Sequence, residues 1–406
     1  MLKQKEFIDS TNLDYYLNVI REFLEVHQIK KRIAESPDEK FPIDLRRKAG
    51  QELLIGLDAP KELGGEGFSA LTMGKIYKEM GKVDVNTREL FGLGHARMLA
   101  YDDNINDYKR DVLNKVLKGE CLIGIGMTEE SSGSDIKNIQ TTVRKVTNGT
   151  YLLNGKKTYV SRILESQYFL VLAKMVDLND KLTFFLVPTS HPNIKISNIN
   201  PTGLKGWSYG SISFENVYLS KDQLVGNEGN GFYMFQKHFA YWRVLMGLLC
   251  IGAAEEALGI TVNYAKEREV FGKPIASFHP VSHPIVKHYS YLKAAELFCY
   301  DALSKIDSNN PSITQSAMAK VLSTEVAYQA IDDCIQFFGA RGYTKEYDLE
   351  KRLRDVRAVK IADGSNPTLI SYCTKDVFGE NIYKLTKEGD FNRVDSCVKP
   401  YAKQNC

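Results

Sequence analysis

The chain has 406 residues, of which 43% are hydrophobic and 25% are charged. This composition is typical of a globular protein and excludes a fibrous or wholly disordered chain. At roughly 100–200 residues per domain, the length predicts two or three domains. The formal net charge of +3 comes from 53 basic and 50 acidic residues, and so small an excess argues against a dedicated nucleic-acid-binding protein.

Cysteine use and hydropathy predict a cytoplasmic protein without a membrane partner. The seven cysteines are odd in number and form no Cys-x-x-Cys pair, which disfavours a disulfide framework. The first six residues contain no apolar stretch of the kind found in a secretion signal. The longest apolar run, residues 244–254, is too short to span a bilayer and is typical of a buried helix.

Patterns along the chain predict an α+β protein with a β domain between two helical regions. Residues 12–118 have helical spacing of apolar positions, interrupted by a glycine-rich loop at 58–67. The segments 141–146 and 151–160 flank Asn148-Gly149, a strong signal for a β-hairpin. Further strands are expected at 168–174, 182–187, 194–199 and 212–219, and long helices at 232–266, 284–306, 312–338 and 347–362. We therefore expect an N-terminal helical domain (1–118), a middle β domain (119–230), a C-terminal helical bundle (231–380) and a polar tail (381–406).

Two polar segments of the predicted β domain are candidates for ligand binding. Residues 126–135 are rich in Gly, Thr and Ser, which let backbone N–H groups approach an anionic or carbonyl-rich ligand. Tyr159 and Ser161 have the same parity on a predicted strand, so we expect a ring and a hydroxyl on one face. Taken alone, the first segment is more typical of a polar turn and the second of an ordinary sheet surface.

Two C-terminal segments are candidates as well. Arg268 follows a long helix and could bind a phosphate, although basic residues also suit a helix C-terminus. Asp363 precedes Gly-Ser at a helix end and could be a general base, although Asp is also a common turn residue.

No metal site is predicted. His279 and His283 have the spacing of helical zinc ligands, but Pro280 and Pro284 are expected to prevent a regular helix there.

In their order and spacing, these motifs resemble the acyl-CoA dehydrogenase family, flavoproteins that desaturate acyl thioesters. The resemblance covers roughly residues 5–375 and is carried by segments 59–67, 127–135, 154–161, 214–217, 226–232, 267–275 and 336–343. It implies a helical N-terminal domain, a β-barrel or sandwich in the middle and a C-terminal four-helix bundle. It also implies FAD as cofactor and a homo-oligomer, either a dimer or a tetramer.

The resemblance implies which residues bind FAD. Met127 and Thr128 would contact the flavin ring, and Ser134 would lie near the substrate thioester or the phosphates. Tyr159 stands where the family usually has Trp against the flavin, and Ser161 where a Thr bonds N5. The other implied FAD contacts are Ser365, His279, and a set from a neighbouring subunit: Arg268, Phe271, Gln336, Gly339 and Ala340.

The catalytic base is where the chain departs from the family. The family usually has Glu-Gly-Thr where this chain has Asp363-Gly364-Ser365, and members with the Glu on an earlier helix have it where Trp242 stands. Asp363 is therefore the expected base for the α-proton, with Arg243 and Gly364 on the substrate side and flavin N5 as hydride acceptor. Asp is one methylene shorter than Glu, and a misplacement of about 1 Å can cost ~10²-fold in rate, so we expect a shifted or smaller substrate.

The acyl group and its partners are left open by the sequence. His95 and Arg97 loosely match the helix that closes the acyl pocket, and because they are two apart only one is expected to face it. That residue could bind a hydroxyl, amine or carboxylate of a short polar acyl group; alternatively, both lie on the surface at a helix end. The thioester carrier could be coenzyme A or an acyl carrier protein, and the electron acceptor an electron-transfer flavoprotein or oxygen.

Two other functions compete with dehydrogenation. A flavin-dependent monooxygenase or oxidase would share the fold, but the presence of Asp363 argues against the monooxygenase, because such relatives lack the base. A non-catalytic flavin-binding protein could contact nucleic acid through basic residues of the tail between Tyr383 and Lys403. Acidic residues dilute that charge, so no nucleic-acid partner is predicted.

Overall fold

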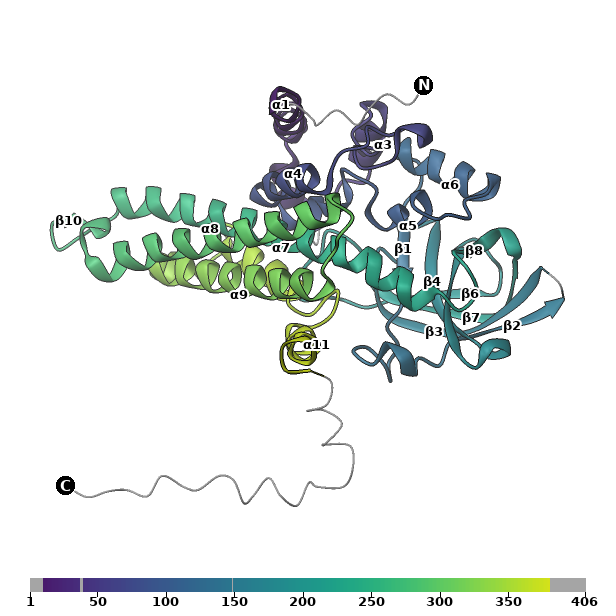
Figure 1. The fold of residues 1–406 in the computed structure, drawn as a ribbon. Coiled ribbons are helices and arrows are strands. Elements are labelled where there is room, and N and C mark those ends of the chain that lie inside the picture. Colours follow the sequence, from purple (N-terminus) through teal and green to yellow (C-terminus); the bar gives the residue numbers. More distant parts are fainter. Residues whose placement is uncertain (1–9, 37–38, 148, 380–406) are drawn as a thin grey trace, which may run out of the picture.

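The computed structural model of the protein describes residues 10–36, 39–147 and 149–379, and the predicted tail with its basic residues lies outside this part of the chain. A sheet lies at one end of a set of long helices, and the N-terminal helices pack beside both (Figure 1). The predicted α+β architecture, with helices before and after a β domain, is confirmed.

The first region is helical, as expected. Its helices are α1 (Ser10–Val26), α2 (Ile29–Glu35), α3 (Asp44–Gln51), α4 (Ala70–Val83), α5 (Arg97–Ala100) and α6 (Asp107–Leu117), with short 3₁₀ turns that include η3 (Val85–Glu89) and η4 (Gly94–Ala96). Helix α4 begins after Ser69, whose hydroxyl accepts a hydrogen bond from the backbone N–H of Thr72. Its buried Met73, Tyr77 and Met80 follow helical spacing and form the face that packs against the central helix α7 (Gly231–Glu267).

The middle region is a single mixed sheet of eight strands. The strands are β1 (Ile123–Gly126), β2 (Thr142–Thr147), β3 (Thr150–Ser161), β4 (Tyr168–Met175), β5 (Lys181–Pro188), β6 (Ile194–Asn198), β7 (Tyr209–Ser220) and β8 (Leu224–Val225). Their order is β6-β7-β3-β2-β4-β5-β8, with β1 paired parallel to β4. The predicted hairpin is confirmed, because β2 and β3 pair antiparallel across the Asn148-Gly149 turn position.

The last region is built on three long helices. They are α7, α8 (His279–Asp307) and α9 (Ile313–Phe338), followed by α10 (Leu349–Val359) and α11 (Asn366–Phe378); a small hairpin of β9 (Glu269–Val270) and β10 (Lys273–Pro274) joins α7 to α8. Among the described helices, α7 alone is long and apolar enough to cross a membrane, but 78% of its most apolar stretch is buried inside the protein. It is therefore the core helix of the fold, packed by α4, α8 and α9.

The expectation that Pro280 and Pro284 prevent a helix is wrong. Helix α8 begins at His279 and contains both prolines. Pro280 lies in the first turn, where a missing N–H costs nothing because that N–H has no intrahelical partner, and Pro284 follows one turn later. The rings of His279 and His283 therefore stack on one helix face, with their centroids 4.4 Å apart. No cluster of three metal-binding side chains occurs in the described part of the chain.

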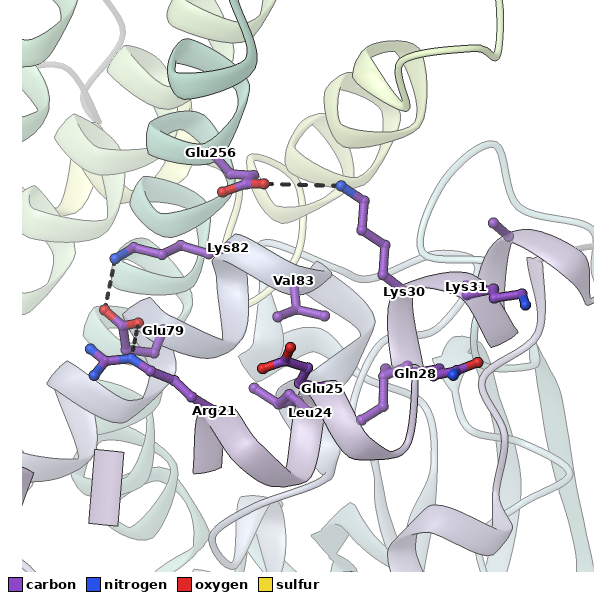
Figure 2. A pocket seen from close by; sticks show the side chains of 12 residues that line it. Arg21, Leu24, Glu25, Gln28, Lys30, Lys31, Glu79, Lys82, Val83 and Glu256 are labelled. Atoms are coloured by element: carbon purple, nitrogen blue, oxygen red, sulfur yellow. Dashed lines mark hydrogen bonds and ion pairs between the residues drawn. The ribbon is translucent and has the colours of Figure 1, made fainter. Parts of the chain in front are cut away.

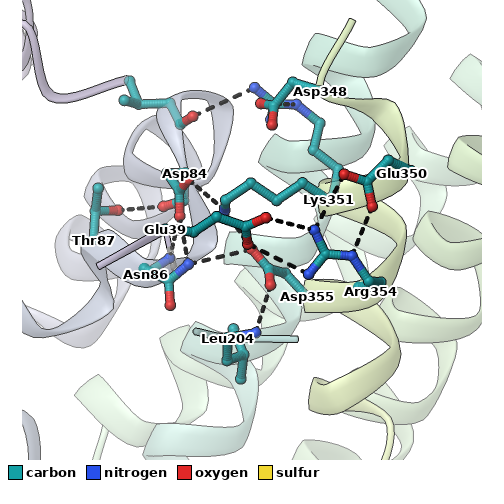
Figure 3. Close-up of polar contacts among 12 residues, drawn as sticks. Glu39, Asp84, Asn86, Thr87, Leu204, Asp348, Glu350, Lys351, Arg354 and Asp355 are labelled. Atoms are coloured by element: carbon teal, nitrogen blue, oxygen red, sulfur yellow. Dashed lines mark hydrogen bonds and ion pairs between the residues drawn. The ribbon is translucent and has the colours of Figure 1, made fainter. Parts of the chain in front are cut away.

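A buried ion cluster, which we call the Lys351 cluster, joins the three regions (Figure 3). It consists of Asp84, Asn86, Lys351 and Asp355. The Nζ of Lys351, on α10, lies 2.6 Å from Asp84 Oδ2 beside α4 and 2.7 Å from Asp355 Oδ2. Asn86 donates to Asp84 and Asp355, and the other oxygen of Asp355 accepts from the backbone N–H of Leu204 in the β domain.

We expect Lys351→Met to destabilise the fold by about 3–5 kcal/mol, the cost typical of leaving a buried partner charge uncompensated. The reason is that Asp84 and Asp355 would both lose their cation in a buried position. Urea unfolding of the full chain measures this. In the matched control, Lys195→Met breaks the exposed pair with Glu215, and a change above about 1 kcal/mol there would contradict the interpretation.

Candidate active site

The predicted base lies on a tight turn between α10 and α11. Asp363 and Gly364 both have left-handed backbone conformations, with φ of 59° and 97°. Glycine is needed at 364 for a second reason, because a Cβ there would lie 3.0 Å from Leu369 Cδ2 and 3.4 Å from Arg243 Nη2. Ser365 then caps α11, its hydroxyl accepting from the backbone N–H of Thr368.

Two buried cations from the neighbouring helices α7 and α9 hold this turn. The Nε of Arg243, on α7, donates to the backbone oxygen of Asp363 at 2.8 Å. The Nζ of Lys320, on α9, donates to the backbone oxygen of Gly364 at 2.9 Å. The structure therefore brings the predicted substrate-side residues Arg243 and Gly364 together with the predicted base.

The environment of the Asp363 carboxyl suits a general base. Burial raises the pKa of Asp363 above its usual range, while the positive charges of Lys320, Arg243, Arg88 and Arg162 act in the opposite direction. Burial makes the carboxylate a stronger proton acceptor, and the cations keep it from being permanently protonated. Three of these cations were not identified from the sequence, because they belong to no motif. They are Arg88 on η3, Arg162 just after β3 and Lys320 on α9.

The segment 126–135 reaches the same turn through hydroxyl groups. Ser134 Oγ lies 2.8 Å from Thr368 Oγ1, which lies 2.7 Å from Ser365 Oγ. The start of the segment is bound to β3, because Thr158 donates its backbone N–H to the backbone oxygen of Thr128 at 2.9 Å. Segments that are far apart in the sequence, 126–135, 154–161 and 363–365, thus form one continuous site.

A buried ion pair shapes the loop that carries Met127 and Thr128. Lys157 Nζ donates to the backbone oxygen of Met127 at 3.0 Å and to Glu129 Oε1 at 2.8 Å. Burial lowers the pKa of Lys157 to about 8, although the Glu129 carboxylate opposes that shift. The same carboxylate accepts the backbone N–H groups of the following chain at Gln140 and Thr141.

The residues along this edge of the sheet fit a planar ring with polar groups at its rim. Met127 and Thr128, just after β1, are half-buried, and the ring of Tyr159 on β3 is 51% exposed. The buried hydroxyl of Thr158 has no hydrogen-bond partner within the described residues. An open aromatic face beside an unpaired hydroxyl and backbone amides is a suitable surface for a flavin.

The parity argument for Tyr159 and Ser161 does not hold as stated. The register of β3 against β7 shifts between Lys157 and Val160, and Tyr159 has a left-handed backbone with φ of 61°. This bulge interrupts the regular alternation of side chains, so sequence parity does not determine which face each residue occupies.

A second set of predicted FAD contacts lies elsewhere in the same chain. Arg268 and Phe271 lie at the end of α7 and on the β9–β10 hairpin, at the end of the long helices away from the sheet (Figure 1). Gln336, Gly339 and Ala340 are exposed at the end of α9, where Phe338 stacks on Tyr264 of α7 at 4.0 Å. Helix α7 has 37 residues and is about 55 Å long, so this set and Met127 lie far apart within one chain.

His95 is buried and its partner is another histidine. His95 Nδ1 lies 2.9 Å from His238 Nε2, and the ring of His95 packs 4.9 Å from that of Trp242, centroid to centroid. His238 was missed from the sequence, although it precedes Trp242 by one turn of α7. The alternative that His95 lies on the surface is wrong, because only 4% of the residue is exposed.

Arg97 is held by the protein itself. Its guanidinium lies over the rings of Tyr101 and Tyr241, at 4.0 and 4.2 Å from their centroids, and 3.4 Å from Asp58 Oδ2. These contacts satisfy its charge without a ligand. Arg97 thus also contacts α7, through Tyr241, but His95 is the more deeply buried of the two candidates and packs beside Trp242.

A separate groove of about 570 Å³ lies on the N-terminal helices (Figure 2). Leu24 and Val83 contribute apolar surface, and charged side chains surround it, with Lys30 of α2 lying 4.0 Å from Glu256 of α7. The groove shares no residue with the turn at Asp363 and belongs to another face of the molecule.

Comparison with known proteins supports the class that this site defines. Residues 14–120, 124–217 and 229–377 match the acyl-CoA dehydrogenase N-terminal, middle and C-terminal domains, respectively. A probable acyl-CoA dehydrogenase, YngJ of Bacillus subtilis, is 30% identical over 353 residues, which cover 83% of this chain and 91% of YngJ.

Solved structures agree with this match. The prolyl acyl carrier protein oxidase AnaB has a TM-score of 0.83 at 23% identity, covering 91% of this chain and 100% of AnaB. The FAD complex of PigA has a TM-score of 0.83 at 24% identity, covering 92% of this chain and 99% of PigA.

Fold and site together thus define a flavin-dependent oxidoreductase. The chain belongs to the acyl-CoA dehydrogenase family.

We expect the His95–His238 pair to make stability fall as the pH drops below about 6.5. Burial lowers the pKa of His95 well below its usual range and that of His238 to about 3, so both stay neutral in the fold but become protonated in the unfolded chain. Each such histidine costs about 1.4 kcal/mol per pH unit between 6.5 and its folded pKa.

His238→Met should therefore flatten the dependence of the unfolding free energy on pH between 6 and 4.5 by about 1.4 kcal/mol per unit. Urea unfolding at several pH values measures the slope. An unchanged slope in the variant would show that His238 is protonated in the fold.

Proposed function

We propose that this protein is an FAD-dependent dehydrogenase that introduces an α,β double bond into a short acyl thioester, with Asp363 as the base. The observation that carries the proposal is the position of the Asp363 carboxyl. Asp363 is half-buried on a turn held by Arg243 and Lys320, and hydroxyl contacts through Thr368 join this turn to the loop of Ser134. An Asp that only forms a turn, without a catalytic role, would need neither partial burial nor nearby cations.

The chemistry of the site follows from these groups. Backbone N–H groups of the turn would polarise the thioester carbonyl and so acidify the α-carbon. Asp363 would take the α-proton, and the electrons of that C–H bond would form the new double bond as a hydride leaves the β-carbon. When bound, FAD supplies the acceptor for that hydride. Met127, Thr128, Tyr159 and Ser161 would hold its ring against the sheet edge.

A short acyl group is supported by the bulky residues next to Arg243 on α7, the helix that binds the Asp363 turn. Trp242 directly precedes Arg243 on α7, and its ring packs on the His95–His238 pair. Phe239, one turn before Arg243, is fully buried against the same rings. Bulky side chains at these positions leave little length for an acyl chain, which also agrees with a base one methylene shorter than Glu.

The proposal also covers the carrier of the thioester, the electron acceptor and the assembly of subunits. The carrier is coenzyme A or an acyl carrier protein, since names of both kinds occur among the relatives. The proposed electron acceptor is an electron-transfer flavoprotein or oxygen. Because Arg268 and Gln336 lie far from Met127 within one chain, a neighbouring subunit would supply them to each FAD, which requires a homo-oligomer. A cytoplasmic location agrees with the buried, unpaired cysteines in the described residues.

We expect Asp363→Asn to slow anaerobic flavin reduction by at least ~10²-fold, because the amide keeps the shape of the side chain but cannot accept the proton. Stopped-flow absorbance of the FAD-loaded protein measures the rate, and the FAD content should be unchanged. In the control, Asp332→Asn changes an exposed carboxyl on α9 and should leave the rate as it was. Reduction at the normal rate in Asp363→Asn would make Asp363 a turn residue and end the proposal.

Butyryl thioesters should be turned over at least about tenfold faster than octanoyl thioesters, on coenzyme A or on a carrier protein, because the bulky rings of Trp242 and His95 would limit the length of the acyl chain. Trp242→Ala should narrow that ratio by opening space beside the base. The measurement is kcat/KM with an artificial electron acceptor. A preference of the unmodified protein for octanoyl would show that the acyl chain takes a path away from α7.

A further inference from the structure

Lys320 is a completely buried lysine that binds only neutral groups. Its Nζ donates to the backbone oxygens of Gly364 at 2.9 Å and Lys360 at 3.3 Å, and to the side-chain oxygen of Asn366 at 2.9 Å. These acceptors span the end of α10, the turn and the start of α11. One side chain of α9 thus connects the whole segment that presents Asp363.

A second contact strengthens the hold of α9 on this segment. The amide of Asn366 donates to Thr324 Oγ1 at 3.0 Å and to Glu325 Oε1 at 2.7 Å, one turn further along α9 from Lys320. On the opposite side of the turn, only the Arg243 bond to the Asp363 backbone oxygen provides a comparable cationic contact among the described residues. The position of the carboxyl is therefore set by α9 and α7 together.

The protonated Lys320 has three N–H donors for its three acceptors, but neutral oxygens do not compensate its charge. Burying an ammonium without a carboxylate in contact is costly. The cost is visible in Lys320 itself, whose pKa burial lowers to about 8. A retained charge at such a position calls for a group on which it acts, and the nearest candidate on the turn is the carboxyl of Asp363.

We propose that Lys320 is the positioning residue of the base: it fixes the turn that carries Asp363, and its charge keeps the Asp363 carboxyl ionised and ready to accept a proton. This inference rests on the proposed function. It adds a residue on α9 that touches neither substrate nor flavin and acts through the base.

Charged and titratable groups from several packed elements surround the side chains of Asp363 and Lys320. Those facing Asp363 are Lys320 of α9, Arg243 of α7, Arg88 of η3 and Arg162 after β3. Besides Asp363, Lys320 is influenced by Arg243 of α7, by Glu325 of its own helix and by the thiol of Cys250, which stays neutral because burial raises its pKa to about 12. Among the cations facing Asp363, Lys320 has the largest effect on its pKa and is the one that bonds Gly364.

The test compares Lys320→Gln, which keeps hydrogen-bond donors but loses the charge, with Lys320→Arg, which keeps the charge. The control is Lys109→Gln, which removes an equally buried lysine from its ion pair with Asp102 on the N-terminal helices. The rate of anaerobic flavin reduction by butyryl thioester is measured from pH 5 to 9 in each FAD-loaded protein.

In Lys320→Gln, loss of a nearby positive charge raises the pKa of Asp363, so the midpoint of the rising limb should move to higher pH by at least ~0.5 unit. The plateau rate should fall at least ~10-fold, because the turn is less well fixed. In Lys320→Arg, which keeps the charge, the midpoint of the rising limb should equal that of the unmodified protein. Lys109→Gln should lower stability but leave the midpoint in place.

A second measurement uses the unmodified protein, so it does not depend on a variant that folds. The backbone N–H of Asn366 donates to the backbone oxygen of Lys360 at 3.0 Å. As Lys320 loses its proton above about pH 8, hydrogen exchange in residues 360–366 should accelerate more than in α7 and α4. An equal acceleration of hydrogen exchange in residues 360–366, α7 and α4 would contradict the role of Lys320 in fixing the turn.

The possible failures are distinguishable. A normal midpoint and plateau in Lys320→Gln, with slow reduction in Asp363→Asn, would overturn the role of Lys320 alone. A shift of the same size in Lys109→Gln would overturn it too, since the effect would then follow from stability. Normal reduction in Asp363→Asn would overturn the base assignment, and the inference about Lys320 with it.

Discussion

The ammonium of Lys351 between two buried carboxylates is the interaction on which the arrangement of the three regions depends. It binds Asp84, beside α4, and Asp355, which in turn accepts the backbone N–H of Leu204 in the β domain (Figure 3). Three residues after Lys351, Arg354 binds Glu39 at 2.9 Å and the backbone oxygen of Thr202 at 2.9 Å. Helix α10 is therefore held by both other regions before it reaches the turn with Asp363.

This arrangement explains how an irregular turn can hold the Asp363 carboxyl in place. The turn has two consecutive residues with positive φ, a conformation that is uncommon for a residue other than glycine such as Asp363. Its position is fixed instead from outside, by α10 on one side, by Arg243 of α7, and by Lys320 of α9. Each of these residues is buried, so the hydrogen bonds do not compete with water.

The balance of charge at this turn also bears on the use of Asp in place of Glu. A shorter side chain stays closer to its own backbone, and burial raises the pKa of the Asp363 carboxyl above its usual range. Four cations around Asp363 oppose that shift and allow the carboxylate form to persist. Trp242, which directly precedes Arg243 on α7, packs on the ring of His95, and these bulky rings agree with the short acyl group that we propose.

The sequence by itself determined the elements and the list of candidate residues. Helical spacing and the Asn148-Gly149 turn signal are local, so α7, α9 and the β2–β3 hairpin could be predicted within a few residues. Local rules also failed where neighbours decide the conformation: Pro284 lies inside α8, and a bulge at Tyr159 breaks the alternation of β3. The collinear motifs identified the family, because they depend on residue order alone, and they made Asp363 the predicted base.

Only the tertiary structure decided which candidates act together. It paired His95 with His238 and assigned Arg97 to Asp58 and two tyrosines, neither of which residue spacing could show. It also revealed Lys320, which has no motif and lies more than forty residues before the turn that it binds. The physical reason is that hydrogen bonds and charges act through space, and packing of α7, α9 and α10 brings their partners within about 3 Å regardless of their separation in the sequence.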